Sequence, residues 1–504
     1  MDGLGEAFED FTPAELTALL TERGDLITPP PPDLAELARR ATTAASVRRA
    51  LDLLNRRELT VAEAVAALPQ PTVSQVAKLT GFAPDQALSR LRKLGLVWED
   101  TGSLAQGFGD VFGPFPGGLA APSPDAWAEA DDGQIGAPLS DAQIAHALAD
   151  LPVAALAVTE KLMWGPPTGA VRHADRVITK PATPVEHLLF RGLLRPADEH
   201  TVVLPREVAL HLRGGFARRP VTEPPRPPTG SRPARIIDSA AIGTAVDIVH
   251  TVEGLLDVVT ARAPAPLRSG GIASRDLTLL ARAAGSDRER TAFALEVAYA
   301  AGLLVVTGPV ITPSAGFEPW LESALVARWT QLVQTWFISP RWRTASDRPL
   351  APLTGTGWAP AARRAVLQPL RPGDAIELAP LAEWAAWHRP FLERYSNISD
   401  LTATVLREAE WLGLTALGQV SGLSQALQGA VAEPLAAAFP VPVDHVLMQS
   451  DLTAVAMGPV ARGTAAVLGL LAEVESRGGG GVYRFTAISV QRGFDAGWSS
   501  ADII

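Results

Sequence analysis

The sequence predicts a mainly α-helical chain of the α+β class, with short β hairpins spread along it instead of one large sheet. Long stretches place apolar residues at helical spacing. Four of these helical patterns end at a Gly-Leu pair followed by a short apolar run, at Gly95, Gly192, Gly302 and Gly413. A chain of 504 residues is also too long for one hydrophobic core, so we expect several domains.

The recurring Gly-Leu pair has a physical explanation. Glycine adopts without strain the left-handed conformation that ends a helix, and the leucine after it can begin a strand packed on the helices. In 72–100 this produces a helix, a turn at Gly81, a second helix and a strand, the order of a winged helix-turn-helix. The segment 274–314 repeats that order, although its second helix is so apolar that we expect it to be buried. Weaker copies lie at 184–212 and 400–418.

Tandem winged-helix modules followed by a different C-terminal α+β domain are therefore the predicted architecture. Composition and turn signals give the boundaries. The predicted regions are an N-terminal helical region (1–65), winged helix 1 with a long loop (66–138), a winged-helix-like module 2 (139–212), a basic Pro-rich linker (213–235), winged helix 3 (236–315), a Trp-rich helical or winged-helix-like region (316–437) and an incomplete C-terminal domain (438–504).

Two regions allow two interpretations each. The linker 213–235 has six arginines, six prolines and one acidic residue, Glu223, so it is either a solvated linker or a basic strap that contacts phosphates. Eight of the twelve tryptophans lie in 316–411. Their helical spacing favours core packing, although tryptophan can also stack on unpaired bases.

Composition argues against most catalytic chemistry. There is no cysteine, and no two of the eight histidines lie three or four residues apart, so the sequence predicts no metal site and no other cofactor. The chain lacks the GxxxxGK[ST] loop of nucleotide triphosphatases and every other catalytic motif we sought, so we expect no enzyme. The acidic N-terminus and the absence of a long apolar run predict a cytoplasmic protein of bacterial type, with nucleoid association as an option and no membrane contact.

The net charge of −10 means that any DNA contact must come from local basic patches. The candidates are cations on the two helices of the first module and at the start of the basic linker. These predicted DNA-binding residues are Lys78, Arg90, Arg92, Lys93, Arg218 and Arg219.

The last segment carries a different pattern. A strand and a polar turn precede a second strand, Thr486 caps a helix, and Ser499 or Ser500 caps another helix that has barely begun at Ile504. We therefore expect this domain to be truncated.

Residues 446–459 (VLMQSDLTAVAMGP) and 472–504 (AEVESRGGGGVYRFTAISVQRGFDAGWSSADII) resemble the N-terminal domain of the XPB/Ssl2-type DNA repair helicases and the related helicase conserved C-terminal domain of helicase-associated bacterial proteins. The stretches SVRRALDLL and LPREVALHLRGG are similar to the front of long bacterial proteins with that domain. The resemblance implies association with DNA or with helicase and repair machinery, but no motor, because the ATPase motifs are absent.

Two functions follow as hypotheses. The first is a non-catalytic, DNA-associated, helicase-related accessory protein linked to DNA repair or transcription, which binds DNA through its winged-helix modules. The second is a protein-binding winged-helix scaffold or regulator that recruits a helicase or polymerase partner without contacting DNA. The sequence names neither the partner, nor the form of DNA, nor the oligomeric state.

Overall fold

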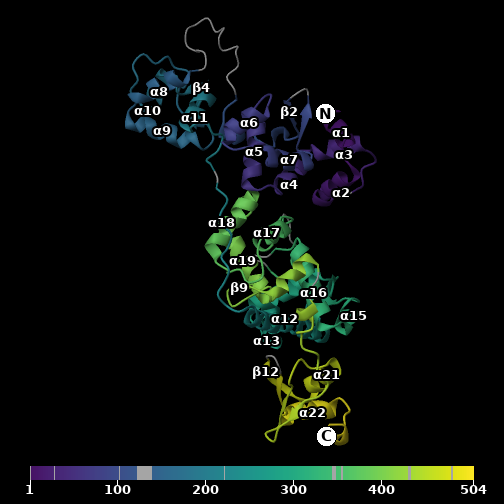
Figure 1. The fold of residues 1–504 in the computed structure, drawn as a ribbon. Helices are drawn as coiled ribbons and strands as arrows, with labels where there is room; N and C mark the ends of the chain where they lie inside the picture. Colours follow the sequence, from purple (N-terminus) through teal and green to yellow (C-terminus); the bar gives the residue numbers. More distant parts are fainter. Residues whose placement is uncertain are drawn as a thin grey trace. The chain divides into compact units, whose positions relative to one another are not determined.

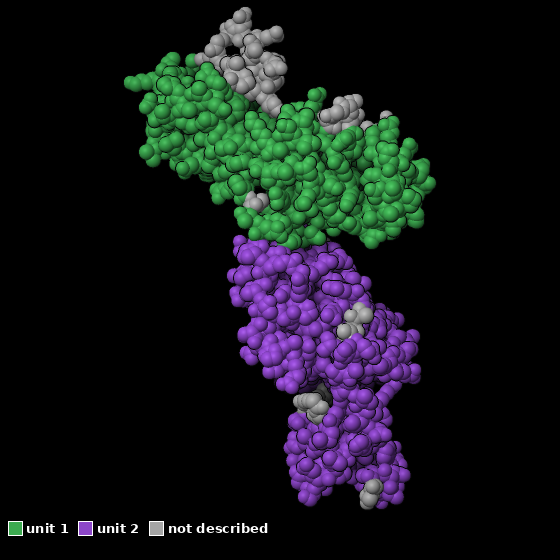
Figure 2. Space-filling view, viewed as in Figure 1, with its two compact units in different colours: residues 1–223, 386–391 green, residues 224–385, 392–504 purple. Residues whose placement is uncertain are grey.

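A computed structural model describes most of the chain. The described residues are 2–27, 29–100, 103–121, 139–220, 222–342, 348–352, 356–429, 433–477 and 481–503. The chain forms two compact units, which are unit 1 (residues 1–223 and 386–391) and unit 2 (residues 224–385 and 392–504) (Figure 2). Helices dominate both units, and the strands are short, so the fold is mixed α+β and mainly α, as predicted.

Unit 1 contains eleven α-helices among its described residues, with two small sheets (Figure 1). Its helices are α1 (Asp2–Glu9), α2 (Pro13–Glu22), η1 (Gly24–Leu26), α3 (Leu34–Ala41), α4 (Ala44–Leu51), α5 (Arg56–Ala66), α6 (Val73–Thr80), α7 (Asp85–Lys93), η2 (Gly109–Phe112), η3 (Pro116–Gly118), α8 (Asp141–Ala149), α9 (Val153–Met163), α10 (Pro184–Phe190) and α11 (Arg206–Leu212). Its strands are β1 (Val97–Asp100), β2 (Ser103–Gln106), β3 (Thr168–Ala170), β4 (Arg195–Asp198) and β5 (Thr201–Val203).

Unit 2 is built around one long central helix, α12. Its helices are α12 (Ala234–Arg262), α13 (Ser274–Ala283), α14 (Arg288–Ala300), α15 (Phe317–Glu322), α16 (Leu325–Ile338), α17 (Ala359–Leu367), α19 (Ile398–Trp411), η6 (Gly422–Gln428), α20 (Glu433–Ala436), α21 (Arg462–Leu471), α22 (Ala487–Asp495) and α23 (Ser500–Ile503). Its strands are β6 (Leu304–Thr307), β7 (Val310–Pro313), β8 (Thr415–Ala416), β9 (Gln419–Val420), β10 (Leu447–Met448), β11 (Thr453–Val455), β12 (Glu473–Arg477) and β13 (Gly481–Arg484). The remaining elements, α18 (Leu378–His388) and η5 (Pro390–Arg394), contain residues of both units.

The described strands form five separate antiparallel sheets. Three are two-stranded hairpins, β1–β2, β6–β7 and β8–β9. A three-stranded sheet has the order β3-β5-β4, and a four-stranded sheet near the C-terminus has the order β10-β11-β13-β12. Each Gly-Leu pair therefore leads into its own small sheet.

All four glycines of the recurring pair are left-handed, as predicted. Their φ angles are 63° at Gly95, 71° at Gly192, 72° at Gly302 and 76° at Gly413. In each case the glycine N–H and the following leucine N–H donate back to the last turn of the helix, the two bonds of a Schellman motif. At the first pair these bonds run from Gly95 to the Arg92 carbonyl over 2.8 Å and from Leu96 to the Leu91 carbonyl over 2.9 Å.

The leucine of each pair is the apolar half of the same motif. Leu96, Leu193, Leu303 and Leu414 are all buried. Each lies one residue past the glycine, where a Schellman motif brings an apolar side chain back onto the helix that has just ended. The pair therefore ends the helix and anchors the start of the strand in the core.

The tryptophans of unit 2 are used mainly for packing. Trp329 and Trp336, seven residues apart on α16, are almost fully buried. Their indole nitrogens donate to the Leu412 carbonyl over 2.8 Å and to the Glu408 carboxylate over 2.6 Å. A buried indole N–H needs such a partner, so these contacts explain how tryptophan is accommodated in this core.

The basic stretch 213–235 is not a solvated linker throughout. That interpretation is wrong for its first residue, Arg213. The Arg213 side chain is 4% exposed and belongs to unit 1, where it donates to backbone carbonyls. Ala217 is also buried, and its N–H donates to the Leu79 carbonyl over 2.8 Å. At its far end the stretch runs into α12, which begins at Ala234.

Candidate nucleic-acid interface

Helices α6 and α7 follow one another around a turn at Gly81, the order of elements that the sequence predicted for 72–100. Thr72 caps α6 in a reciprocal arrangement with Gln75, and Gly81 ends the helix with φ 78°. Val76 of α6 and Leu88 and Leu91 of α7 are buried in the same apolar cluster of unit 1. The opposite sides of both helices are therefore directed to solvent.

The solvent-exposed side of these helices is polar and nearly free of negative charge. We use the name "α6–α7 surface" for the exposed residues Ser74, Gln75, Lys78, Gln86, Ser89 and Lys93. Hydroxyl, amide and ammonium groups of this kind donate hydrogen bonds to phosphates and base edges. Asp85 is the one carboxylate on α6 or α7, and it lies in the first turn of α7.

Sequence reasoning selected the two lysines of this surface and missed its serines and glutamines. The sequence does contain a pattern that indicates these residues, because Gln86, Ser89 and Lys93 recur at intervals of three and four residues on one side of α7. A search for positive charge alone does not find uncharged donors. These residues extend the predicted patch along both helices.

Arg90 is engaged within the protein. Its two terminal nitrogens contact the two carboxylate oxygens of Glu22 on α2, with Nη1 at 2.8 Å from Oε1. The hydrogen bond from Arg90 lowers the pKa of Glu22, and burial opposes that effect more weakly. The pKa of Arg90 is raised by the same hydrogen bond. The charge of Arg90 is therefore compensated, and a phosphate would have to compete with Glu22 for it.

Two further predicted arginines are also ion-paired. Arg92 pairs with Glu99 on β1. Arg218 makes a two-bond contact with Glu63 on α5, from Nε to Oε2 over 2.6 Å and from Nη2 to Oε1 over 3.0 Å. These arginines stabilise unit 1 itself and offer only part of their charge to a ligand.

The remaining predicted cations make no ion pair with the residues that the structure describes. Lys78 and Lys93 are exposed on the α6–α7 surface, and the guanidinium of Arg219 lies 5.4 Å from the ring centre of Trp164. The hydrogen bond from Ala217 to the end of α6 brings Arg218 and Arg219 next to that helix. The two predicted patches are thus neighbours in unit 1.

The C-terminal end of α7 is held by a buried arginine of the N-terminal helices. Arg23 is 1% exposed, and it donates to the Leu94 carbonyl over 2.8 Å, to the Ala41 carbonyl over 3.0 Å and to the hydroxyl of Ser46 over 2.6 Å. Burial lowers the pKa of Arg23 to about 10, so it remains charged at neutral pH. This contact fixes the position of α7 relative to α3 and α4.

The corresponding helix of unit 2 is buried along most of its length. Residues 291–298 of α14 are all buried, as the apolar pattern predicted. The first turn of α14 differs, because Arg288 and Glu289 are exposed there.

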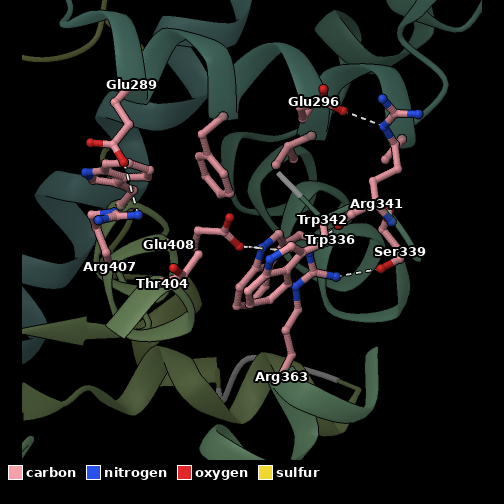
Figure 3. Close-up of a pocket in the computed structure, with 14 residues that line it drawn as sticks. Glu289, Glu296, Trp336, Ser339, Arg341, Trp342, Arg363, Thr404, Arg407 and Glu408 are labelled. Carbon is pink, nitrogen blue, oxygen red and sulfur yellow. Dashed lines mark hydrogen bonds and ion pairs between the residues drawn. The ribbon is translucent and has the colours of Figure 1, made fainter. Parts of the chain in front are cut away.

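A pocket of unit 2 lies among α14, α16, α17 and α19, with a cavity of about 50 Å³ (Figure 3). Most of its polar groups are paired with one another, although the buried Nε of Arg363 has no hydrogen-bond partner. Arg363, only 2% exposed, donates to the carbonyls of Ser339 over 2.6 Å and Arg341 over 2.7 Å, and burial lowers its pKa.

The aromatic and acidic side chains that line this pocket also contact arginines of the pocket. The Arg363 guanidinium lies 5.0 Å from the ring centre of Trp336 and 5.8 Å from that of Trp342. At the other side Arg407 pairs with Glu289 over 3.0 Å. We interpret this pocket as a structural network of the unit 2 core.

The described residues contain no group of three or more side chains placed to hold a metal ion. No described helix combines the length and apolar character needed to cross a bilayer.

The comparisons with known proteins point to the C-terminal end of the chain. The profile of one family, described as the helicase conserved C-terminal domain, matches residues 446–504. This range runs from the start of the four-stranded sheet to the last helix and contains β12, α21 and α22 (Figure 1). No curated protein matches the chain significantly. The chain therefore carries a helicase-associated C-terminal domain, and the match covers only this last part.

Proposed function

We propose that this chain is a non-catalytic, helicase-related accessory protein that binds duplex DNA through winged-helix modules. The observation that carries the proposal is the match of residues 446–504 to the helicase conserved C-terminal domain. The kinship with XPB/Ssl2-type proteins, a bacterial origin, a cytoplasmic location and a role in DNA repair or transcription belong to the same proposal.

The winged-helix assignment is supported by the order and pairing of the elements. In the first module α5, α6 and α7 precede the β1–β2 hairpin. In the second module β3 comes before α10, and the sheet order β3-β5-β4 places the last strand in the middle. A helix that ends in a Schellman motif and continues into a hairpin is common to four places in the chain.

The DNA contact is assigned to the α6–α7 surface together with Arg219. Lys78, Lys93 and Arg219 supply charge, and the uncharged donors of the surface reach base edges or phosphates. Arg90, Arg92 and Arg218 stand beside these residues but are shared with carboxylates. Because the whole chain has a charge of −10, binding should be weak and steeply dependent on salt.

Reversing both lysines of the α6–α7 surface is expected to weaken duplex binding. The double variant Lys78→Glu/Lys93→Glu removes two phosphate contacts, so at low salt the affinity should fall by about tenfold or more, and the slope of log K against log salt should become shallower by about two. Fluorescence anisotropy with a labelled duplex measures both quantities.

The matched control is Arg48→Glu/Arg49→Glu on α4, which makes the same charge change at two exposed positions. If both double variants weaken binding equally, the effect comes from total charge, and the assignment to the α6–α7 surface is wrong.

Absence of a motor belongs to the proposal because no GxxxxGK[ST] loop occurs in the sequence. The purified chain should hydrolyse no ATP, with or without duplex or forked DNA. Hydrolysis that copurifies with the chain through several columns would contradict this part of the proposal.

A protein-binding scaffold is the second candidate function. It is favoured by the burial of residues 291–298 of α14 and by the acidic charge. Capture of a helicase or polymerase subunit that survives nuclease treatment, together with no DNA binding at low salt, would select this candidate over the first.

A further inference from the structure

The C-terminal segment leaves many large apolar side chains in solvent. Those exposed are Val441, Leu447, Met448, Leu452, Met457, Val474, Ile488 and Phe494. The apolar side chains it buries are mostly small, namely Ala454, Ala456, Leu468, Leu471 and Ala472. Exposed apolar surface on a folded domain marks an interaction site when its side chains are contiguous, as those of Leu447 and Met448 are on β10.

The two edges of the four-stranded sheet differ in chemistry. The β12 edge carries Glu473 and Glu475, both exposed, and charged side chains of this kind prevent edge-to-edge pairing. The β10 edge carries Leu447 and Met448, which are 54% and 60% exposed, and no charge between residues 446 and 449. One edge is protected against pairing, and the other edge is open.

The backbone of the open edge is oriented for pairing. The Gln449 N–H donates to the Thr453 carbonyl over 2.7 Å, so Gln449 faces β11. Alternate residues of a strand face opposite sides, so the N–H and C=O of the neighbouring Met448 are directed away from β11. Leu452, in the turn between β10 and β11, holds a left-handed φ of 63° and is 62% exposed.

We propose that the β10 edge pairs with the β10 edge of a second copy of this chain. An antiparallel pair of identical strands has a two-fold axis, and each Met448 N–H then donates to the Met448 carbonyl of the other copy. Two copies of an edge usually repel through like charges, but β10 has none. Leu447 and Met448 of both copies lose solvent exposure on pairing.

The surface area buried in the contact determines how stable the dimer is. A stable dimer buries about 800 Å² on each partner. Two short strands supply only part of that area, and exposed neighbours such as Leu452 add to it. The dimer is therefore weak and depends on protein concentration, and it is independent of any DNA binding by unit 1.

Sedimentation of the full-length chain over a concentration series tests the proposal. Wild type should pass from monomer to dimer as its concentration rises from low to high micromolar. Met448→Lys introduces like charges that face each other across the axis, as native edge strands do, and Met448→Pro removes the outward N–H. Each variant should raise the dissociation constant by about tenfold or more.

Val474→Lys on β12 is the matched control, because Val474 is an exposed residue of the opposite edge. It should dimerise as wild type does. The proposal is overturned if wild type stays monomeric throughout the series, or if its dimer persists unchanged in both Met448 variants. Far-ultraviolet circular dichroism shows whether the variants are folded.

Discussion

Replacing Arg213 by methionine is expected to lower the free energy of unfolding of unit 1 by about 3–5 kcal/mol. The Arg213 guanidinium donates to the carbonyls of Gly117 over 2.8 Å, Ala217 over 2.7 Å and Gly118 over 2.7 Å, and it also bonds to that of Met163. Methionine keeps the apolar stem and removes every donor, so these carbonyls lose their partner.

Hydrogen exchange measured by mass spectrometry can localise this loss. Peptides from α9 and from the segment around Gly117 should exchange faster in Arg213→Met, while peptides from unit 2 serve as an internal reference. Arg219→Met is the control, because Arg219 is exposed and its loss should cost less than about 1 kcal/mol. Equal effects of the two substitutions would show that the hydrogen bonds from Arg213 to these carbonyls do not stabilise unit 1.

Replacing Gly413 by alanine is expected to destabilise unit 2 by more than about 3 kcal/mol. An alanine held at this left-handed φ lowers the free energy of unfolding by about 1–2 kcal/mol relative to glycine. At Gly413 a Cβ would also lie 2.4 Å from the carbonyl oxygen of Ala241, a backbone atom of α12 that cannot rotate away. The central helix of the unit would have to move.

The other three glycines form a graded series with Gly413. At Gly302 a Cβ meets nothing within 4 Å, so Gly302→Ala should cost only the conformational strain of about 1–2 kcal/mol. Gly192→Ala should behave similarly, because its nearest neighbour, Leu139, is 3.7 Å away. Gly95→Ala should be intermediate, since its Cβ would lie 2.9 Å from the Phe8 ring.

Thermal unfolding of the four variants measures this series. The expected order of destabilisation is Gly413, then Gly95, then Gly192 and Gly302 together. If Gly302→Ala and Gly192→Ala leave stability unchanged, the left-handed glycine is not needed to end these helices.

The joins between helix and strand could be predicted because their causes are local. A Schellman motif involves six consecutive residues, and the sequence shows both its glycine and its leucine. The same holds for the cap at Thr486, whose hydroxyl accepts the Ser489 N–H over 3.1 Å, and for the hairpin around Gly308 between β6 and β7.

The partners of the predicted DNA-binding arginines could not be predicted, because they are distant in sequence. Arg90 and Glu22 are 68 residues apart, and Arg218 and Glu63 are 155 residues apart. Charge composition alone makes both arginines look free. Only the packing of α2 and α5 shows that they are ion-paired.

The structural role of Arg213 could not be predicted for a related reason. The arginines and prolines around it indicate a solvated segment, and nothing local distinguishes it from Arg218 or Arg219. Its role depends on carbonyl groups of Gly117 and Gly118 that converge only in the folded unit. A single arginine that satisfies several carbonyls has no sequence signature.

The β10 edge was also invisible from the sequence. The segment around Leu447 and Met448 predicts a strand, but an apolar strand is expected to lie inside a sheet. The structure places it at the edge, next to β11 alone. Exposure there is a consequence of strand order, which short-range patterns do not determine.

The central proposal is that this chain binds duplex DNA through Lys78, Lys93 and Arg219 of unit 1. The measurement that tests it most directly is the affinity of the wild-type chain for a duplex across a salt series. Three phosphate contacts, made by Lys78, Lys93 and Arg219, predict a linear fall of log K with log salt and a slope of about −3. No binding at low salt, or an affinity that does not change with salt, would contradict the claim.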